Sequence, residues 1–199
     1  MGETDSPFHR GEIALQERLG VRDKMERAGR RMIRDHMPQQ HREFFAGLPL
    51  LVVATLDASA RPWASVLAGK PGFVRASDAK TLGIRARPIY GDPLNEALIE
   101  GADIGALGLE FETRRRNRVN GRVGRPSENG FKIRVRQSFG NCPKYIQARA
   151  YELGQDIESI GEARAVRRGE ALNRAEAAMI ARSDTLFIAS QFSDNEDDW

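Results

Sequence analysis

The stretch LPLLVVATLDASARPWASVLAGKPGFV, residues 48–74, decides the fold class. Residues 50–56 form a continuous apolar run rich in Val and Leu, which is the pattern of a buried β-strand. A polar turn beginning at Asp57 follows, and Pro62 opens a second apolar run over residues 63–69. Two such runs joined by a short polar turn predict an antiparallel hairpin.

Short segments with strand-like patterns continue along the chain after this hairpin. They lie at residues 73–75, 81–84, 102–110, 114–123 and 131–137. Strands of this length and spacing indicate a meander, and meanders of this size usually close into a barrel or sandwich. A short helix is expected to start after Asp92, whose side chain suits an N-cap. We therefore expect an α+β protein built around a small antiparallel β-barrel.

Helices are expected on both sides of the barrel in the sequence. Val21, Met25, Ala28 and Met32 recur at spacings of four, three and four, so residues 11–47 are expected to be helical. Helices are also expected at residues 143–151 and 162–181, followed by a strand at 184–190 (DTLFIAS), and a polar end that should be disordered. The expected organisation is a helical arm (1–48), a barrel core (49–150), a C-terminal segment (151–190) and an acidic tail (191–199).

Composition and charge limit the classes of protein to which this chain can belong. The net charge is +3, so the chain as a whole is not built as a polyanion binder. With Cys142 as the single cysteine, no intramolecular disulfide can form, which favours a reducing compartment. No apolar stretch approaches the roughly 18 residues that a membrane span needs, and the first residues lack a signal-peptide pattern. A cytoplasmic protein with no membrane association is therefore expected.

The order of several sequence blocks resembles a known family. These blocks are RPWASVLAGKPGFV at residues 61–74, RRRNRVNG at 114–121 and QSFGNCPKYIQ at 137–147. Together they resemble the pyridoxamine 5'-phosphate oxidase-like split-barrel flavoproteins, specifically the group of flavin-nucleotide-binding proteins. The resemblance implies a split β-barrel that binds FMN, generally where two barrels meet.

Members of this group also contain a second related unit, which begins with a DTxFIA strand. Here DTLFIAS is present, but the Ser-His-Arg-Gly-Gly block that normally follows is not. The resemblance therefore covers the first unit and one strand of the second. It implies an FMN-binding protein with flavin-dependent oxidoreductase activity, which pairs as a homodimer or with a separate second half. The alternative is a half-barrel without catalytic activity that acts only through such association.

The hairpin supplies the first candidate cofactor residues. By resemblance its second strand contacts the flavin, which makes Trp63, Ser65, Val66 and Lys70 candidates for FMN binding. A phosphate dianion prefers hydroxyl, ammonium and guanidinium donors, and Ser65 and Lys70 can provide two of them. The alternative is an ordinary core strand in which Trp63 only packs.

A basic strand supplies the second group. Residues 113–136 hold eight Arg, one Lys and a single acid. Side chains alternate across a strand, so Arg114, Arg116 and Arg118 are expected on one face, where they repel one another unless an anion lies opposite. Arg116 and Arg118 are therefore candidate phosphate ligands. A solvated edge strand explains the same pattern, and a basic nucleic-acid-binding surface is a weaker third interpretation.

The block QSFGNCP supplies Asn141, a candidate cap for a helix that starts near Pro143, and hence a further candidate cofactor contact. The helix start would also activate the thiol of Cys142, although a purely structural turn is the favoured interpretation. The three histidines lack metal-ligand spacing, so no metal site is expected. No residue pattern identifies a catalytic group.

Overall fold

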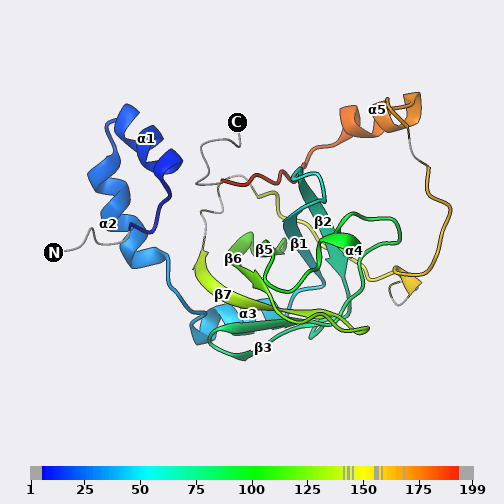
Figure 1. The fold of residues 1–199 in the computed structure, drawn as a ribbon, viewed down its shortest axis with the longest axis horizontal. Helices are drawn as coiled ribbons and strands as arrows, with labels where there is room; N and C mark the ends of the chain where they lie inside the picture. Colours follow the sequence, from blue (N-terminus) through cyan, green and yellow to red (C-terminus); the bar gives the residue numbers. More distant parts are fainter. Residues whose placement is uncertain are drawn as a thin grey trace.

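The computed structural model describes residues 6–140, 142, 144, 146–154, 157, 159–167 and 169–192. Its helices are α1 (Arg10–Arg18), α2 (Arg22–Met32), α3 (Gln39–Ala46), α4 (Leu94–Ala97) and α5 (Arg174–Arg182). Its strands are β1 (Leu50–Leu56), β2 (Pro62–Ala68), β3 (Val74–Asp78), β4 (Thr81–Ile84), β5 (Asp103–Glu110), β6 (Arg115–Val123) and β7 (Phe131–Gly140) (Figure 1).

The strands form a single antiparallel sheet in the order β2-β1-β5-β6-β7-β4-β3. The predicted hairpin is confirmed, with Leu50 opposite Ala68 and Leu56 opposite Pro62. Two pairings join strands that are far apart in the sequence, β1 with β5 and β4 with β7. They place the β1–β2 hairpin and the β3–β4 hairpin on opposite sides of β5, β6 and β7. Strands β2 and β3 are left as the two edges.

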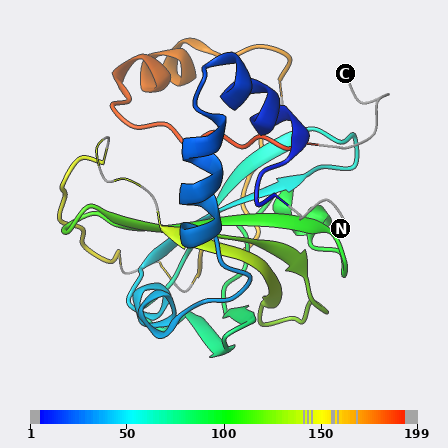
Figure 2. The same cartoon turned by 90° about the vertical axis from the view of Figure 1, so that its left-hand side faces the viewer.

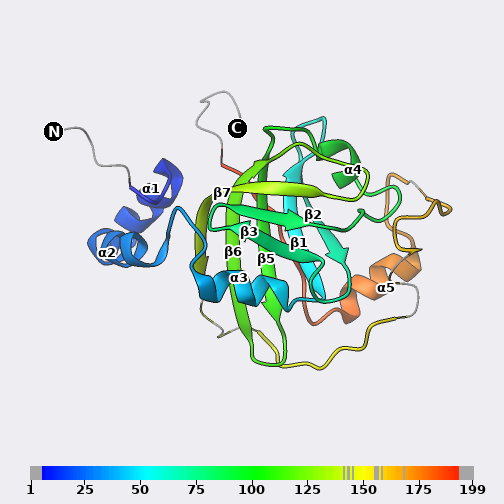
Figure 3. The same cartoon turned by 90° about the horizontal axis from the view of Figure 1, so that it is seen from below.

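The sheet curls around one hydrophobic core and forms an open barrel (Figure 3). Leu67 on edge strand β2 and Val74 on the opposite edge strand β3 belong to the same buried cluster, together with residues of all five strands between them. A flat sheet of this order would hold its two edges far apart, so the shared core requires strong curvature. The expected α+β split barrel is therefore confirmed.

Helix α3 closes one end of the barrel. Phe44 and Phe45 on α3, and Leu48 just after it, are all buried in the core. Gly108 faces them from β5, where a Cβ would lie only 2.6 Å from a Leu48 methyl. The missing side chain at this position leaves the space that the helix occupies.

Helices α1 and α2 lie beside the barrel rather than over its core (Figure 2). They attach to β7 through two backbone hydrogen bonds between Arg34 and Ser138, of 3.0 and 2.7 Å. The amide Nε2 of Gln137 also donates to the carbonyl of Pro7 at 3.2 Å. The helices expected within residues 11–47 are present as three separate segments, of which α1 and α2 lie beside the barrel and α3 closes it, and Gly20 adopts a left-handed conformation between α1 and α2.

The C-terminal predictions are partly wrong. The described residues of 143–151 contain no helix, and within 162–181 the helix begins only at α5, where Asn173 and Glu176 form a capping box. Residues 184–190 are extended but pair with no strand among the described residues. Short helices are stable mainly when one face packs against the rest of the protein. The C-terminal segment offers little such packing, since even α5 buries none of its residues.

Candidate functional site

Two adjoining cavities lie at the end of β2. One has a volume of about 340 Å³ and the other about 520 Å³. Both are bounded by Ala68 of β2 and by Ile157 and Ile160 of the C-terminal segment. The two cavities therefore share a wall.

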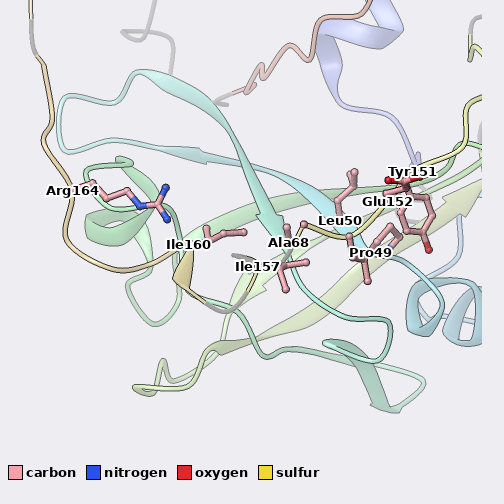
Figure 4. Close-up of a pocket in the computed structure, with 10 residues that line it drawn as sticks. Pro49, Leu50, Ala68, Tyr151, Glu152, Ile157, Ile160 and Arg164 are labelled. Carbon is pink, nitrogen blue, oxygen red and sulfur yellow. The ribbon is translucent and has the colours of Figure 1, made fainter.

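The smaller cavity is mainly apolar (Figure 4). Leu50 and Ala68 form its floor on the barrel, and its roof is formed by residues 151–154 with Ile157 and Ile160. Arg164 and Glu152 are the charged residues at its margin. An apolar space of this size suits the planar ring system of a small ligand.

The larger cavity is basic. Lys70, Arg85 and Arg87 line it, against the single acid Glu162. The guanidinium of Arg85 donates to the carbonyl oxygen of Gly72 at 3.2 Å, and Nε of Arg87 donates to that of Glu128 at 3.1 Å. These acceptors are neutral and neither arginine forms an ion pair within the described part of the chain, so their positive charge stays available to an anion.

The C-terminal segment is held at this cavity by close packing. A Cβ on Gly161 would lie 2.8 Å from the Cβ of Arg87, and one on Gly91 would lie 2.7 Å from a methyl of Val166. The absence of a side chain at Gly161 and Gly91 thus lets residues 161–166 approach residues 87–91 closely. Gly91 also has a φ of 81°, which side-chain-bearing residues adopt with strain.

Of the predicted cofactor residues, Lys70 is the one that lines these cavities. Ser65 instead points to the inside of the barrel and its hydroxyl donates to Oδ1 of Asp92 at 2.6 Å. The same oxygen accepts from the N–H of Leu94 at 2.8 Å, so Ser65 and Asp92 together fix the start of α4. Trp63 lies at the exposed end of β2, where its indole N–H donates to Oδ2 of Asp57 at 2.8 Å.

Three other candidates lie on the outer face of the sheet. A row of paired residues crosses this face from Val66 through Val52 and Leu107 to Arg118. Arg116 is two residues before Arg118 on the same strand. Arg114 does not join them, because it precedes β6 and adopts a φ of 59° in the turn. The distance across three strand intervals is about 14 Å, so Val66 and Arg118 do not form one compact site.

Residues 184–192, named here the strap, run along this outer face beside β5 and β1 (Figures 1 and 3). One end is fixed by an ion pair between Asp184 and Arg149. At the other end the ring of Phe192 stacks on His9, with ring centroids 3.9 Å apart. The outer face is thus already crossed by the chain itself, whereas the cavities at the end of β2 are open.

Asn141 lies outside the described residues, and Cys142 is exposed with its thiol free. No cluster of three or more His, Cys, Asp or Glu side chains occurs in the part of the chain that the structure describes. Among the same residues, no helix combines the length and apolar character that crossing a bilayer requires.

No family model matches the sequence, and no curated protein matches it. The structure is similar to the crystal structure of a HupZ variant from Group A Streptococcus, with 17% sequence identity and a TM-score of 0.41 over 53% of this chain and 99% of that one. The protein thus belongs to the class of α+β open barrels, with a cavity pair that combines apolar and basic walls.

Sequence reasoning missed most of the cavity residues. Arg85 and Arg87 follow β4 in the sequence IRAR, and their i, i+2 spacing in an extended segment was a usable signal. The roof residues, by contrast, carried no signal, because their place over β2 depends on packing of a loop.

Proposed function

We propose that the protein binds a flavin nucleotide, FMN, in the two cavities at the end of β2. The observation that carries the proposal is the shared wall between an apolar cavity and a cavity lined by three cations. FMN has the matching form, with a flat ring system at one end and a phosphate dianion at the other. The family resemblance of residues 61–74 supports the same ligand.

In this arrangement the ring lies between the barrel residues Leu50 and Ala68 and the roof formed by residues 151–154, Ile157 and Ile160. The phosphate lies in the larger cavity, where Lys70, Arg85 and Arg87 supply charge-assisted hydrogen bonds. A bound flavin would supply redox chemistry, and this chain would position the ring and exclude water from part of it. We assign no catalytic residue.

The test is a titration of the protein with FMN and, separately, with riboflavin, which lacks the phosphate. We expect FMN to bind at least tenfold more tightly than riboflavin, because a hydrogen bond to a charged group contributes about 1.5–3 kcal/mol. An Arg85→Gln, Arg87→Gln double variant should lose this preference while keeping its affinity for riboflavin. The matched control is Arg136→Gln on the exposed face of β7.

Failure of both flavins to bind at 100 μM would overturn the proposal. Binding of FMN with no effect of the double variant would place the phosphate elsewhere. If pyridoxal 5'-phosphate binds and FMN does not, the site is for aromatic phosphates but not for flavin.

A second proposal concerns association with another chain. The C-terminal segment exposes many large apolar side chains, including Leu172, Met179, Leu186 and Ile188, the last with 89% of its surface exposed. Scattered exposed apolar residues are ordinary, but a run of them in one segment favours a protein contact. We propose that this segment packs against a second copy or a partner half. Light scattering after gel filtration tests it, and a monomer at 100 μM would contradict it.

A further inference from the structure

Edge strand β2 presents a row of backbone groups that face away from the sheet. The amide of Gly69 donates to the carbonyl of Pro49 at 3.0 Å, and the amide of Asp57 donates to the carbonyl of Arg61 at 3.0 Å. Bonded pairs alternate along an antiparallel ladder, so the odd-numbered residues of β2 are the ones that bond to β1. The even-numbered residues therefore direct their backbone groups to the free edge; they are Pro62, Ala64, Val66 and Ala68.

This edge is accessible and unpaired in the part of the chain that the structure describes. Among those residues, β2 pairs with β1 alone, and no other backbone hydrogen bond reaches its outward-facing groups. Trp63 and Val66 keep 39% and 37% of their surface exposed, and Ala64 between them is exposed as well. Unpaired N–H and C=O groups along an exposed strand are a template on which another strand can pair.

The opposite edge of the sheet is protected against such pairing, whereas β2 is not. Strand β3 spans five residues, carries Arg75 and Asp78, and contains a register shift before Asp78. Helix α3 also packs against it. Charges, bulges and a covering helix are the usual devices that stop an edge from pairing. Strand β2 spans seven residues in continuous register, has no charged residue, and has its proline at the first position. Of the two edges, β2 is thus the one suited to receive another strand.

The backbone of β2 is complementary to a second copy of itself. In an antiparallel pairing centred on Ser65, Ala64 lies opposite the partner's Val66, and Pro62 lies opposite the partner's Ala68. The outward-facing amides of Ala64, Val66 and Ala68 then each meet a carbonyl of the partner strand, so every free donor of the edge gains an acceptor. Pro62 has no N–H, but it lies at the end of the pairing, where the loss does not interrupt the row.

The side chains suit the same pairing. Residues directly opposite each other lie on the same face of a sheet, so Trp63 faces the partner's Leu67 and Ala64 faces the partner's Val66. Just outside the strand, Arg61 lies opposite the partner's Gly69, so no two like charges are opposed. Apolar cross-strand pairs stabilise an antiparallel pairing, and opposed like charges would destabilise it.

We propose that the protein forms a two-fold symmetric dimer in which β2 of each copy pairs antiparallel with β2 of the other, centred on Ser65. Such an interface uses the same surface on both subunits, so it closes without leaving a further β2 edge free. The barrel sheet becomes continuous across the two copies. This surface is distinct from the exposed C-terminal segment, and the pairing does not depend on flavin binding.

Disulfide formation tests the pairing and its register. In a Cys142→Ser background, a chain with Ala64→Cys is mixed with a chain with Val66→Cys and oxidised. The Cα atoms of these opposed positions are expected about 5.5 Å apart, within the range of a disulfide, whereas two copies of one position are diagonal neighbours at about 7–8 Å. We expect the mixture to form linked dimers at least about tenfold faster than either chain alone. No link in the mixture, or equal rates in all three samples, would overturn the proposal.

Sedimentation equilibrium with Ala64→Pro tests the row of hydrogen bonds. The amide of residue 64 faces away from β1, so a proline there removes no hydrogen bond within the barrel, and edge strands tolerate proline at such positions. We expect the dissociation constant of the dimer to rise at least about tenfold, because each copy loses one intermolecular hydrogen bond. Ala64→Thr keeps the amide and is the matched control, which should dimerise as the unchanged protein does.

Circular dichroism checks that the proline variant remains folded. If the proline disturbs the strand, Val66→Lys replaces it, because the two lysines would lie on one face as diagonal neighbours and repel each other. An unchanged protein that is monomeric, or a dimer that both variants leave intact, would overturn the proposal. Dimers that dissociate with Leu186→Ser and Ile188→Ser, but not with the β2 variants, would also overturn it and assign association to the C-terminal segment.

Discussion

Nδ1 of His41 lies 2.8 Å from the hydroxyl oxygen of Ser138, although the two residues are 97 positions apart. His41 is on α3 and Ser138 on β7, and both are buried, Ser138 with no exposed surface. The contact ties the helix that closes the barrel to the strand that also holds the N-terminal arm. Burial lowers the pKa of His41, and the positive charges of Arg34, Arg115 and His36 lower it further.

The lowered pKa of His41 predicts loss of stability in acid. The folded state keeps the imidazole neutral, while the unfolded chain takes up a proton near the ordinary value of about 6.5. Stability is therefore fully present above about pH 6.5 and falls as the pH drops from there toward the folded pKa. We expect His41→Asn to flatten this part of the curve of unfolding free energy against pH.

Ser138→Ala is the matched control for that experiment. It removes the hydrogen bond and should cost about 1–3 kcal/mol at neutral pH, because a buried ring nitrogen loses its partner. The imidazole still titrates, so the slope between pH 7 and 5 should remain. If His41→Asn keeps the slope as well, the acid sensitivity has another origin.

Asp92 is predicted to be more important for stability than its position in a loop implies. Its Oδ1 accepts from both Ser65 and the Leu94 N–H, and so joins edge strand β2 to the start of α4. Asp92→Ala should lower the unfolding free energy by about 1–2 kcal/mol in urea, since two donors lose their acceptor. Asp92→Asn retains an acceptor oxygen and should cost clearly less; an equal cost would point to charge rather than hydrogen bonding.

Gly121 is predicted to be intolerant of any side chain. It lies at the bulge where the register between β6 and β7 shifts, and a Cβ there would lie 2.1 Å from the carbonyl oxygen of Arg134. Because the obstacle is backbone, Gly121→Ala should cost at least about 2 kcal/mol. Gly105→Ala is the control, since its Cβ would meet its nearest neighbour at an ordinary 3.4 Å. Equal midpoints of denaturation for the two variants would contradict this.

The turn of the first hairpin is predicted to lose order in acid through Asp57. Its carboxylate accepts from the side chain of Arg61 and from the indole of Trp63. These contacts, the one with Arg61 first, hold the pKa of Asp57 well below its usual range. The contribution is therefore present above about pH 4 and is lost as the pH falls through the folded pKa.

Fluorescence of Trp63 reports this change in a Trp199→Phe background, where it is the remaining tryptophan. We expect the emission to shift below pH 3 in that protein. With Asp57→Asn added, the shift should be absent. A shift that persists would mean that Trp63 responds to global unfolding rather than to Asp57.

The strands were predictable because their signal is local. The Val- and Leu-rich run at residues 50–56 and the alternating pattern at 131–137 each occupy a strand in the structure, β1 and β7. The same reasoning was wrong at residues 184–190, which have strand-like composition but no pairing partner among the described residues. Composition sets the preference for extended backbone, whereas pairing depends on what lies beside it.

By itself, the sequence determined the α+β class, the hairpin and the order of the barrel strands along the chain, because alternation and turn residues act over a few positions. Only the tertiary structure decided which strands are neighbours and which charged residues share a site. Lys70, Arg85 and Arg87 meet Ile157 and Ile160 at one cavity because the sheet curls and the C-terminal segment packs back on it. Such contacts depend on long-range packing, for which no short stretch of sequence carries a signal.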